Sequence, residues 1–179
     1  TTYDYPVPAV PSYEKTTIEA VYGTNWYVKA VGGDDANSGG TWETAKATLE
    51  GALTNALSGD VVTAAPGVYD CGKMIQKTKI YSAPTLYSRV VVPEGVILES
   101  SEGPEATVIM GKAADVDDDE WHNGVGALRC AIVEKNAVLR GFTLTGGRTL
   151  GNASGTSESD DNRGGGVYAR NATSAVIEN

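Results

Sequence analysis

The chain has 179 residues, of which 41% are apolar, and a formal net charge of −9 at pH 7, so it is long enough for one compact domain or a short solenoid. An acidic surface repels phosphate backbones and anionic lipids, and no apolar run is long enough to cross a bilayer. Nucleic acid is therefore not expected as a partner, and membrane insertion is not expected either.

The first 25 residues are expected to form an extended lead segment. Prolines at positions 6, 8 and 11 disfavour regular structure there. A linker is favoured over a segment that folds only against a neighbouring subunit. The chain starts at Thr1 without an initiator methionine or a signal peptide, which predicts a processed mature end or a cut fragment, and an extracellular or cell-surface location.

The first regular elements are predicted between residues 26 and 57. Residues 26–30 are expected to form a strand, and a loop of turn-forming residues follows at 32–40. Apolar side chains recur at spacings of three and four over residues 44–57, which predicts an amphipathic helix. The residues of that apolar stripe are Ala45, Leu49, Ala52, Leu53, Ala56 and Leu57.

Beyond residue 60 the chain consists of short β-branched runs separated by turns, and the pattern repeats. Similar runs begin at Arg89, Arg129 and Gly166. Repeats of strand, tight turn and strand are typical of a β-solenoid, where stacking buries the apolar face of each repeat. Asn136 and Asn171 are expected in turns, where a left-handed backbone is tolerated. The sequence predicts an all-β solenoid over residues 26–179.

Two polar stretches, at about 112–126 and 149–163, interrupt these repeats and are expected to form loops on the flank of the solenoid. Asp160 and Asp161 are adjacent, and neighbouring residues on a strand point to opposite faces, so a solvated loop is favoured over an acid–base pair. His122 has no partner for nucleophilic chemistry. No catalytic residue is assigned.

Two acidic loops contain candidate calcium ligands, because Ca²⁺ prefers carboxylate and carbonyl oxygens. Neither loop has the ligand spacing of an EF-hand, so hydrated loops are the favoured interpretation and no cofactor is expected. The candidate ligands are Asp34, Asp35, Asn37, Asp117, Asp118 and Asp119.

Cys71 and Cys130 are the only cysteines, and their spacing fits no zinc-binding pattern. A single disulfide and two buried thiols are both compatible with the sequence. For a chain expected to be secreted, the disulfide is the favoured prediction.

The segment from Trp26 to Tyr69 resembles the opening of secreted right-handed parallel β-helix proteins, where an N-terminal helix caps the first coil and a Pro-Gly turn closes it. Residues 137–147 and 164–168 resemble coils of bacterial surface and autotransporter-like proteins with this pectin-lyase-like fold. The resemblance implies a right-handed parallel β-helix with an N-terminal capping α-helix. The fold carries polysaccharide lyases, glycoside hydrolases, adhesins and fibres, so it does not by itself select a function.

The favoured function is a non-catalytic structural or adhesive module of an extracellular cell-surface or fibre protein, because the sequence lacks the fuller motifs of the pectinase families. The alternative is the N-terminal part of a polysaccharide lyase or glycoside hydrolase whose catalytic coils lie beyond residue 179. Expected partners are other subunits or coils of the same protein and extracellular polysaccharide. A coil-forming run reaches residues 175–179, which predicts a solenoid that continues or is covered by another subunit. If 179 residues is the mature length, axial filaments through the lead segment are expected.

Overall fold

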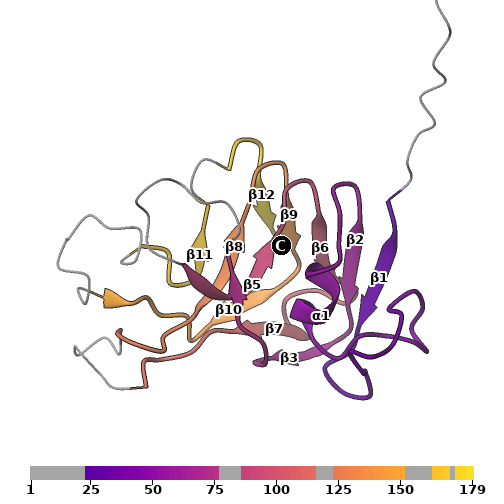
Figure 1. The fold of residues 1–179 in the computed structure, drawn as a ribbon, viewed down its shortest axis with the longest axis horizontal. Coiled ribbons are helices and arrows are strands. Elements are labelled where there is room, and N and C mark those ends of the chain that lie inside the picture. Colours follow the sequence, from indigo (N-terminus) through magenta and orange to yellow (C-terminus); the bar gives the residue numbers. More distant parts are fainter. Residues whose placement is uncertain (1–22, 77–85, 116–122, 152–162, 170–171) are drawn as a thin grey trace, which may run out of the picture.

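A computed structural model describes residues 23–76, 86–115, 123–151, 163–169 and 172–179. This part of the chain is mostly β, with strands that stack in parallel into a solenoid of about three turns (Figure 1). Along the chain the strands enter three sheets, A, B and C, in that repeating order, and one turn adds two consecutive strands to sheet C. The prediction of a parallel β-solenoid is confirmed.

Sheet A is the longest stack, and all of its neighbouring strands pair in parallel. In spatial order its strands are β1 (Asn25–Val28), β2 (Val61–Ala64), β6 (Ile97–Ser100), β9 (Val138–Arg140) and β12 (Val176–Glu178).

Sheets B and C complete each coil. Sheet B contains β3 (Gly67–Tyr69), β7 (Thr107–Met110) and β10 (Thr143–Thr145). Sheet C contains β4 (Met74–Ile75), β5 (Tyr87–Val92), β8 (Arg129–Val133) and β11 (Val167–Tyr168). Within sheet C, β4 pairs antiparallel with β5, and the other neighbours are parallel.

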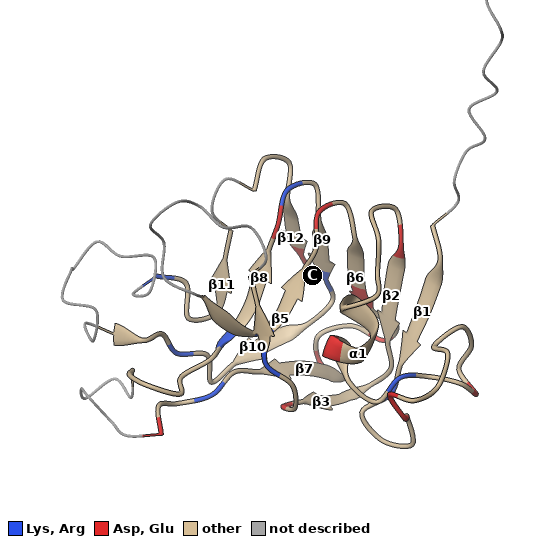
Figure 2. Cartoon of the chain, viewed as in Figure 1, with Lys and Arg blue, Asp and Glu red and all other residues tan. Residues whose placement is uncertain are grey.

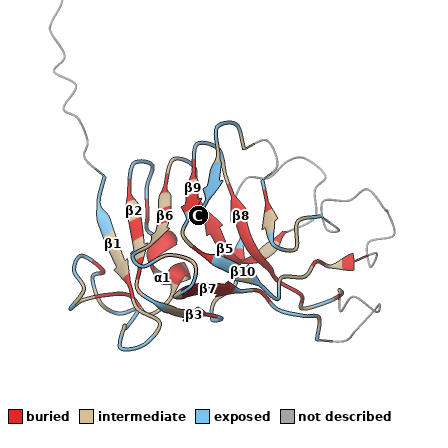
Figure 3. Ribbon diagram, turned by 180° about the vertical axis from the view of Figure 1, so that it is seen from behind, coloured by how far each residue is buried: buried red, intermediate tan, exposed pale blue. Residues whose placement is uncertain are grey.

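The interior is filled by side chains that stack in register from coil to coil. On sheet A, Val62 of β2 pairs with Leu98 of β6, which pairs with Leu139 of β9, and all three are at most 2% exposed. Full burial of one such side chain stabilises the fold by about 1.5–3 kcal/mol. Strands β5 and β8 are buried along almost their whole length (Figure 3). The alternating β-branched pattern therefore reflects one continuous apolar stack.

Helix α1 spans Leu49–Leu53 and is shorter than the predicted helix of residues 44–57. It begins after Thr48, whose hydroxyl accepts a hydrogen bond from Gly51 N at 2.9 Å. Its apolar side chains join the core, and the helix packs against β1, β2 and β5, the first strands of sheet A and the first long strand of sheet C. A short N-terminal helix thus covers the first coil.

Hydrogen bonds to groups outside the helix explain why the helix is short. Lys46 N donates to Tyr27 O and Lys29 N donates to Lys46 O, both at 2.9 Å, so Lys46 continues the sheet beside β1. At the other end, Leu57 N donates to the carboxylate of Asp60 at 2.9 Å. Leu57 is 73% exposed, so its predicted place in the buried stripe was wrong.

A column of left-handed residues marks the corner where the chain enters sheet A, called here the C–A corner because the later coils reach it from sheet C. Each coil contributes one such residue: Gly59 (φ 97°), Gly95 (φ 72°), Asn136 (φ 56°) and Ser174 (φ 59°). The turns are linked by backbone hydrogen bonds of 3.0–3.1 Å, from Gly59 N to Gly95 O and from Gly95 N to Lys135 O. The expected conformation of Asn136 is confirmed, whereas Asn171 lies outside the described residues.

The connections between sheets B and C form a second corner, the B–C corner. The first is short, residues 70–73 between β3 and β4. The next two run over residues 111–128, between β7 and β8, and over 146–166, between β10 and β11. The predicted polar stretches fall within these connections, and residues 116–122 and 152–162 lie outside the described part of the chain. At this corner the backbones of successive coils touch, because a Cβ on Gly111 would lie 2.4 Å from Gly147 Cα.

Candidate functional site

The outer face of sheet A carries an ordered row of polar side chains. Side chains alternate between the two faces of a strand, so residues paired with an outward position also point outward. The strand register aligns five of them in a row, called here the polar strip: Tyr27 (β1), Thr63 (β2), Glu99 (β6), Arg140 (β9) and Glu178 (β12).

Hydrogen bonds and ion pairs connect the members of the polar strip. Thr63 Oγ1 donates to Glu99 Oε1 at 3.2 Å, and Arg140 donates through Nε (3.0 Å) and Nη2 (2.5 Å) to Glu99 Oε2. Arg140 Nη1 lies 4.0 Å from Glu178 Oε1. The hydrogen bond to Glu99 raises the pKa of Arg140. Figure 2 shows the alternating charges on β6, β9 and β12. The strip is partly exposed to solvent, and its members hold one another through these contacts.

An aromatic pair lies at the N-terminal end of the polar strip. The rings of Tyr27 and Trp42 have centroids 4.6 Å apart and are tilted by 55°. Lys29 Nζ lies 5.8 Å from the centroid of the Trp42 ring. Both aromatic side chains are partly exposed. The loop that carries Trp42 is held beside β1, since Tyr27 N donates to Gly39 O at 2.8 Å.

A row of aliphatic side chains runs parallel to the polar strip on the same outer face. Val61, Ile97, Val138 and Val176 are paired in register, and each of them retains some exposure. The outer face of sheet A therefore presents one apolar and one polar row at the spacing of the strands, about 4.8 Å.

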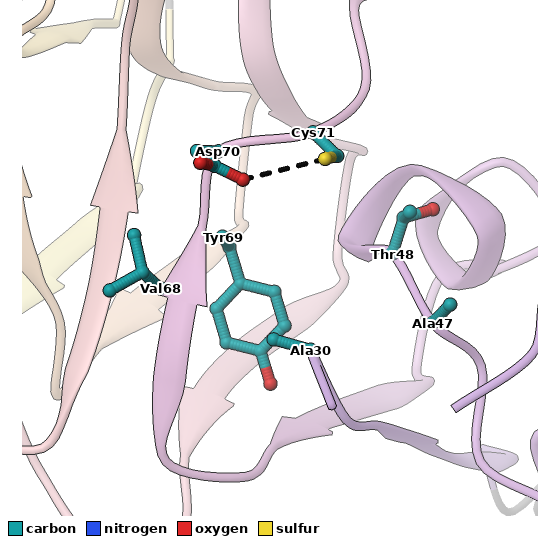
Figure 4. Close-up of a pocket in the computed structure, with 7 residues that line it drawn as sticks. All are labelled: Ala30, Ala47, Thr48, Val68, Tyr69, Asp70 and Cys71. Atoms are coloured by element: carbon teal, nitrogen blue, oxygen red, sulfur yellow. Dashed lines mark hydrogen bonds between the residues drawn. The ribbon is translucent and has the colours of Figure 1, made fainter. Parts of the chain in front are cut away.

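A pocket of about 150 Å³ lies where β3 meets the loop before α1 (Figure 4). It is lined by Ala30, Ala47, Thr48, Val68, Tyr69, Asp70 and Cys71. Tyr69 has a structural role there, because its hydroxyl donates to Ala65 O at 2.8 Å and burial raises its pKa to about 12. Asp70 Oδ1 accepts a hydrogen bond from the Cys71 thiol at 3.4 Å. The pocket thus places one carboxylate beside one thiol, and the hydrogen bond and charge of Asp70 raise the pKa of that thiol, which disfavours the nucleophilic thiolate.

Both cysteines are free thiols in the structure, contrary to the predicted disulfide. Cys130 is buried in β8, and its Sγ lies 3.1 Å from Thr145 O, the acceptor of its hydrogen bond. Cys71 is exposed on the connection between β3 and β4. One thiol therefore belongs to the packed coil and the other to the surface. The pKa of Cys71 is raised by the hydrogen bond and charge of Asp70, and that of Cys130 is raised by burial.

Thiol titration tests this placement. In native protein purified without reductant, we expect a colorimetric disulfide reagent to modify one thiol, Cys71, and to modify both after denaturation. Cys71→Ser should leave no native reactivity, and Cys130→Ala should leave it unchanged. A denatured, unreduced chain with no titratable thiol would instead establish the disulfide.

The described calcium candidates use their oxygens to hold the N-terminal loop. Asp35 Oδ1 accepts hydrogen bonds from Ala47 N and Thr48 N, both at 2.9 Å, and Oδ2 accepts one from Thr48 Oγ1 at 2.8 Å. Asp34 Oδ1 accepts from Ala36 N at 2.9 Å. Within the described ranges, no group of three His, Cys, Asp or Glu residues could hold a metal ion.

The remaining candidates are placed as follows. Asn37 Nδ2 donates to Ala45 O at 3.2 Å, so its amide also fixes the loop. Asp117, Asp118 and Asp119 lie outside the described residues, as do His122, Asp160 and Asp161.

Two arginines are buried, which the sequence analysis did not predict. Arg89 is 7% exposed and donates to Met110 O at 2.7 Å and to Gly72 O, while burial lowers its pKa. Arg129 is 1% exposed, donates to Arg163 O at 2.8 Å, and lies over the ring of Tyr168. Their position next to β-branched runs was the available signal. Both fasten backbone carbonyls near the B–C corner, which is a structural role.

Fold and surface together define the chain as a parallel β-solenoid protein. No family model, curated protein or solved structure was found to match it. Among the residues that the structure describes, no helix has the length and apolar character that crossing a membrane requires.

Proposed function

We propose that the chain is a non-catalytic structural or adhesive solenoid module of an extracellular cell-surface or fibre protein. The observation that carries the proposal is the outer face of sheet A, where the polar row keeps one register through five strands and the aliphatic row keeps it through four. A regular face of this kind suits contact with an extended or repeating partner, because each coil offers a similar set of groups at a fixed spacing.

The chemistry of the described residues supports a role in binding a partner rather than in catalysing a reaction. Perturbed groups such as Asp60, Tyr69 and Arg89 make hydrogen bonds within the coil. The sequence resemblance to secreted parallel β-helix proteins of the surface type supports the extracellular location. Other subunits or coils of the same protein and extracellular polysaccharide are the proposed partners.

The location is tested by labelling intact producer cells. We expect an antibody against the purified chain to label intact cells or the culture fluid, with protease treatment of intact cells removing the signal. A cytoplasmic protein serves as the control and should be detected only after lysis. Detection of the chain only in lysates would overturn the extracellular proposal.

Catalysis is tested separately with the purified native protein. Polysaccharide mixtures incubated with it should release no reducing ends and no unsaturated products. Sustained product formation, proportional to protein concentration, would overturn the non-catalytic proposal and favour a lyase or hydrolase.

A further inference from the structure

We propose that the outer face of sheet A binds an extended, uncharged polysaccharide that lies along the solenoid axis, with the sugar rings starting on Tyr27 and Trp42 and continuing over the polar strip. This inference rests on the proposed function as an extracellular module and names its ligand class and binding site.

Charge favours an uncharged partner at this face. Lys29 and Arg140 contribute two positive charges, Glu99 and Glu178 contribute two negative ones, and exposed Glu43 beside Trp42 adds a third negative charge. These described charges therefore sum to only −1. The whole chain carries −9, which repels polyanions. A ligand rich in hydroxyl groups has donors and acceptors for both Arg140 and Glu99 and brings no net charge to desolvate.

The aromatic pair supplies the apolar contact that a sugar ring needs. One face of a pyranose carries C–H groups, and Tyr and Trp present large apolar surfaces at low conformational cost. Tyr27 and Trp42 support each other at 4.6 Å, and both remain partly exposed. Their position at one end of the polar strip gives the ligand a starting point and a direction.

The polar strip is organised before any ligand arrives. Thr63, Glu99 and Arg140 already hold one another through hydrogen bonds, so binding orders few side chains. From β1 to β12 the strip crosses four strand spacings, about 19 Å in total. An extended chain of several sugars spans that length, whereas a monosaccharide reaches only one end.

The test is co-sedimentation of the purified chain with insoluble uncharged polysaccharides: cellulose, chitin, curdlan and starch granules. Soluble polygalacturonate serves as the anionic comparison in affinity electrophoresis. We expect binding to at least one uncharged polymer. Trp42→Ala and Arg140→Ala should each weaken it about tenfold, since each removes one kind of contact. Short oligosaccharides should compete better as their length increases.

Two further variants make the result interpretable. Trp42→Phe keeps an aromatic ring against Tyr27 and should retain most of the binding, which separates ligand contact from loss of folding. Val68→Ala, on the outer face of sheet B and 47% exposed, should bind within twofold of the native chain. The midpoint of urea denaturation is measured for every variant, and binding is compared only among variants that are folded.

Three results would overturn the inference: absence of binding to every uncharged polymer, binding that Trp42→Ala and Arg140→Ala leave intact, or binding to polygalacturonate alone. Loss of binding in Val68→Ala would move the site to sheet B and overturn it as well. A chain that labels intact cells but fails this assay would leave the proposed function standing, so the two outcomes are distinguishable.

Discussion

Replacing Leu53 with alanine is expected to lower the free energy of unfolding by about 2–5 kcal/mol, because it leaves a cavity beneath α1. Leu53 is 1% exposed and belongs to the core cluster that joins α1 to sheets A and C. Leu53→Asp should abolish soluble expression, since it buries an unpaired charge. Urea denaturation followed by circular dichroism measures the alanine variant.

Leu57 provides a matched control four residues along the chain. It is the same residue type in the same apparent stripe, but it is 73% exposed. Leu57→Ala should change the free energy of unfolding by less than about 0.5 kcal/mol. Equal destabilisation by the two alanine substitutions would contradict the observed end of α1.

The second large effect is expected at Asp60, which ties the first coil together. Its carboxylate is 6% exposed and accepts hydrogen bonds from Thr24 N (2.6 Å), Leu57 N (2.9 Å) and Trp26 Nε1 (3.0 Å). Asp60→Ala should lower the free energy of unfolding by about 2–4 kcal/mol, because three donors lose their acceptor. Glu105→Ala, at an exposed loop position, should cost less than about 0.5 kcal/mol.

Asp60 also gives stability a defined pH dependence. Burial alone would raise its pKa, but the hydrogen bonds from Leu57, Trp26 and Thr24 outweigh burial and hold the pKa below the ordinary 3.8. The unfolded state therefore takes up a proton first as pH falls. The contribution of Asp60 is complete above pH 3.8 and is lost as pH falls toward and through the folded pKa.

Acid unfolding curves of the native chain and of Asp60→Asn test whether Asp60 contributes less stability as the pH falls. The native chain should lose stability between pH 5 and its acid transition more steeply than the variant, whose residue 60 does not titrate. Identical slopes for the two proteins would show that Asp60 titrates alike in the folded and unfolded states.

The solenoid was predictable because each coil has a short sequence pattern of β-branched runs and turns that repeats along the chain. The β-branched runs at Arg89 and Arg129 repeat, and in the structure they are the neighbouring strands β5 and β8. Asn136, placed by sequence in a left-handed turn, adopts φ 56°. The start of the helix was not predictable, because the backbone hydrogen bonds between Lys46 and the distant residues Tyr27 and Lys29 keep residues 44–48 out of the helix.

The candidate site was much harder to foresee. Thr63 and Glu99 are 36 residues apart, and Glu99 and Arg140 are 41 apart, so no fixed spacing connects the members of the polar strip. Their alignment depends on the lengths of the connections in each coil. The register of the strands therefore cannot be read directly from the sequence. The pairing of the two cysteines was hard to predict for a related reason. An even number of cysteines does not show whether two thiols lie on the same side of the coil.

The two corners of the solenoid differ in how much change they tolerate. At the C–A corner every turn bonds to the next through its backbone, as Gly59 does to Gly95, so an added residue would break that link. At the B–C corner the connections 111–128 and 146–166 already differ in length while β8 and β11 stay paired. Foreign peptides grafted at this second corner would be displayed side by side along one edge of an unchanged rod, which makes the chain a natural scaffold for arrayed epitopes.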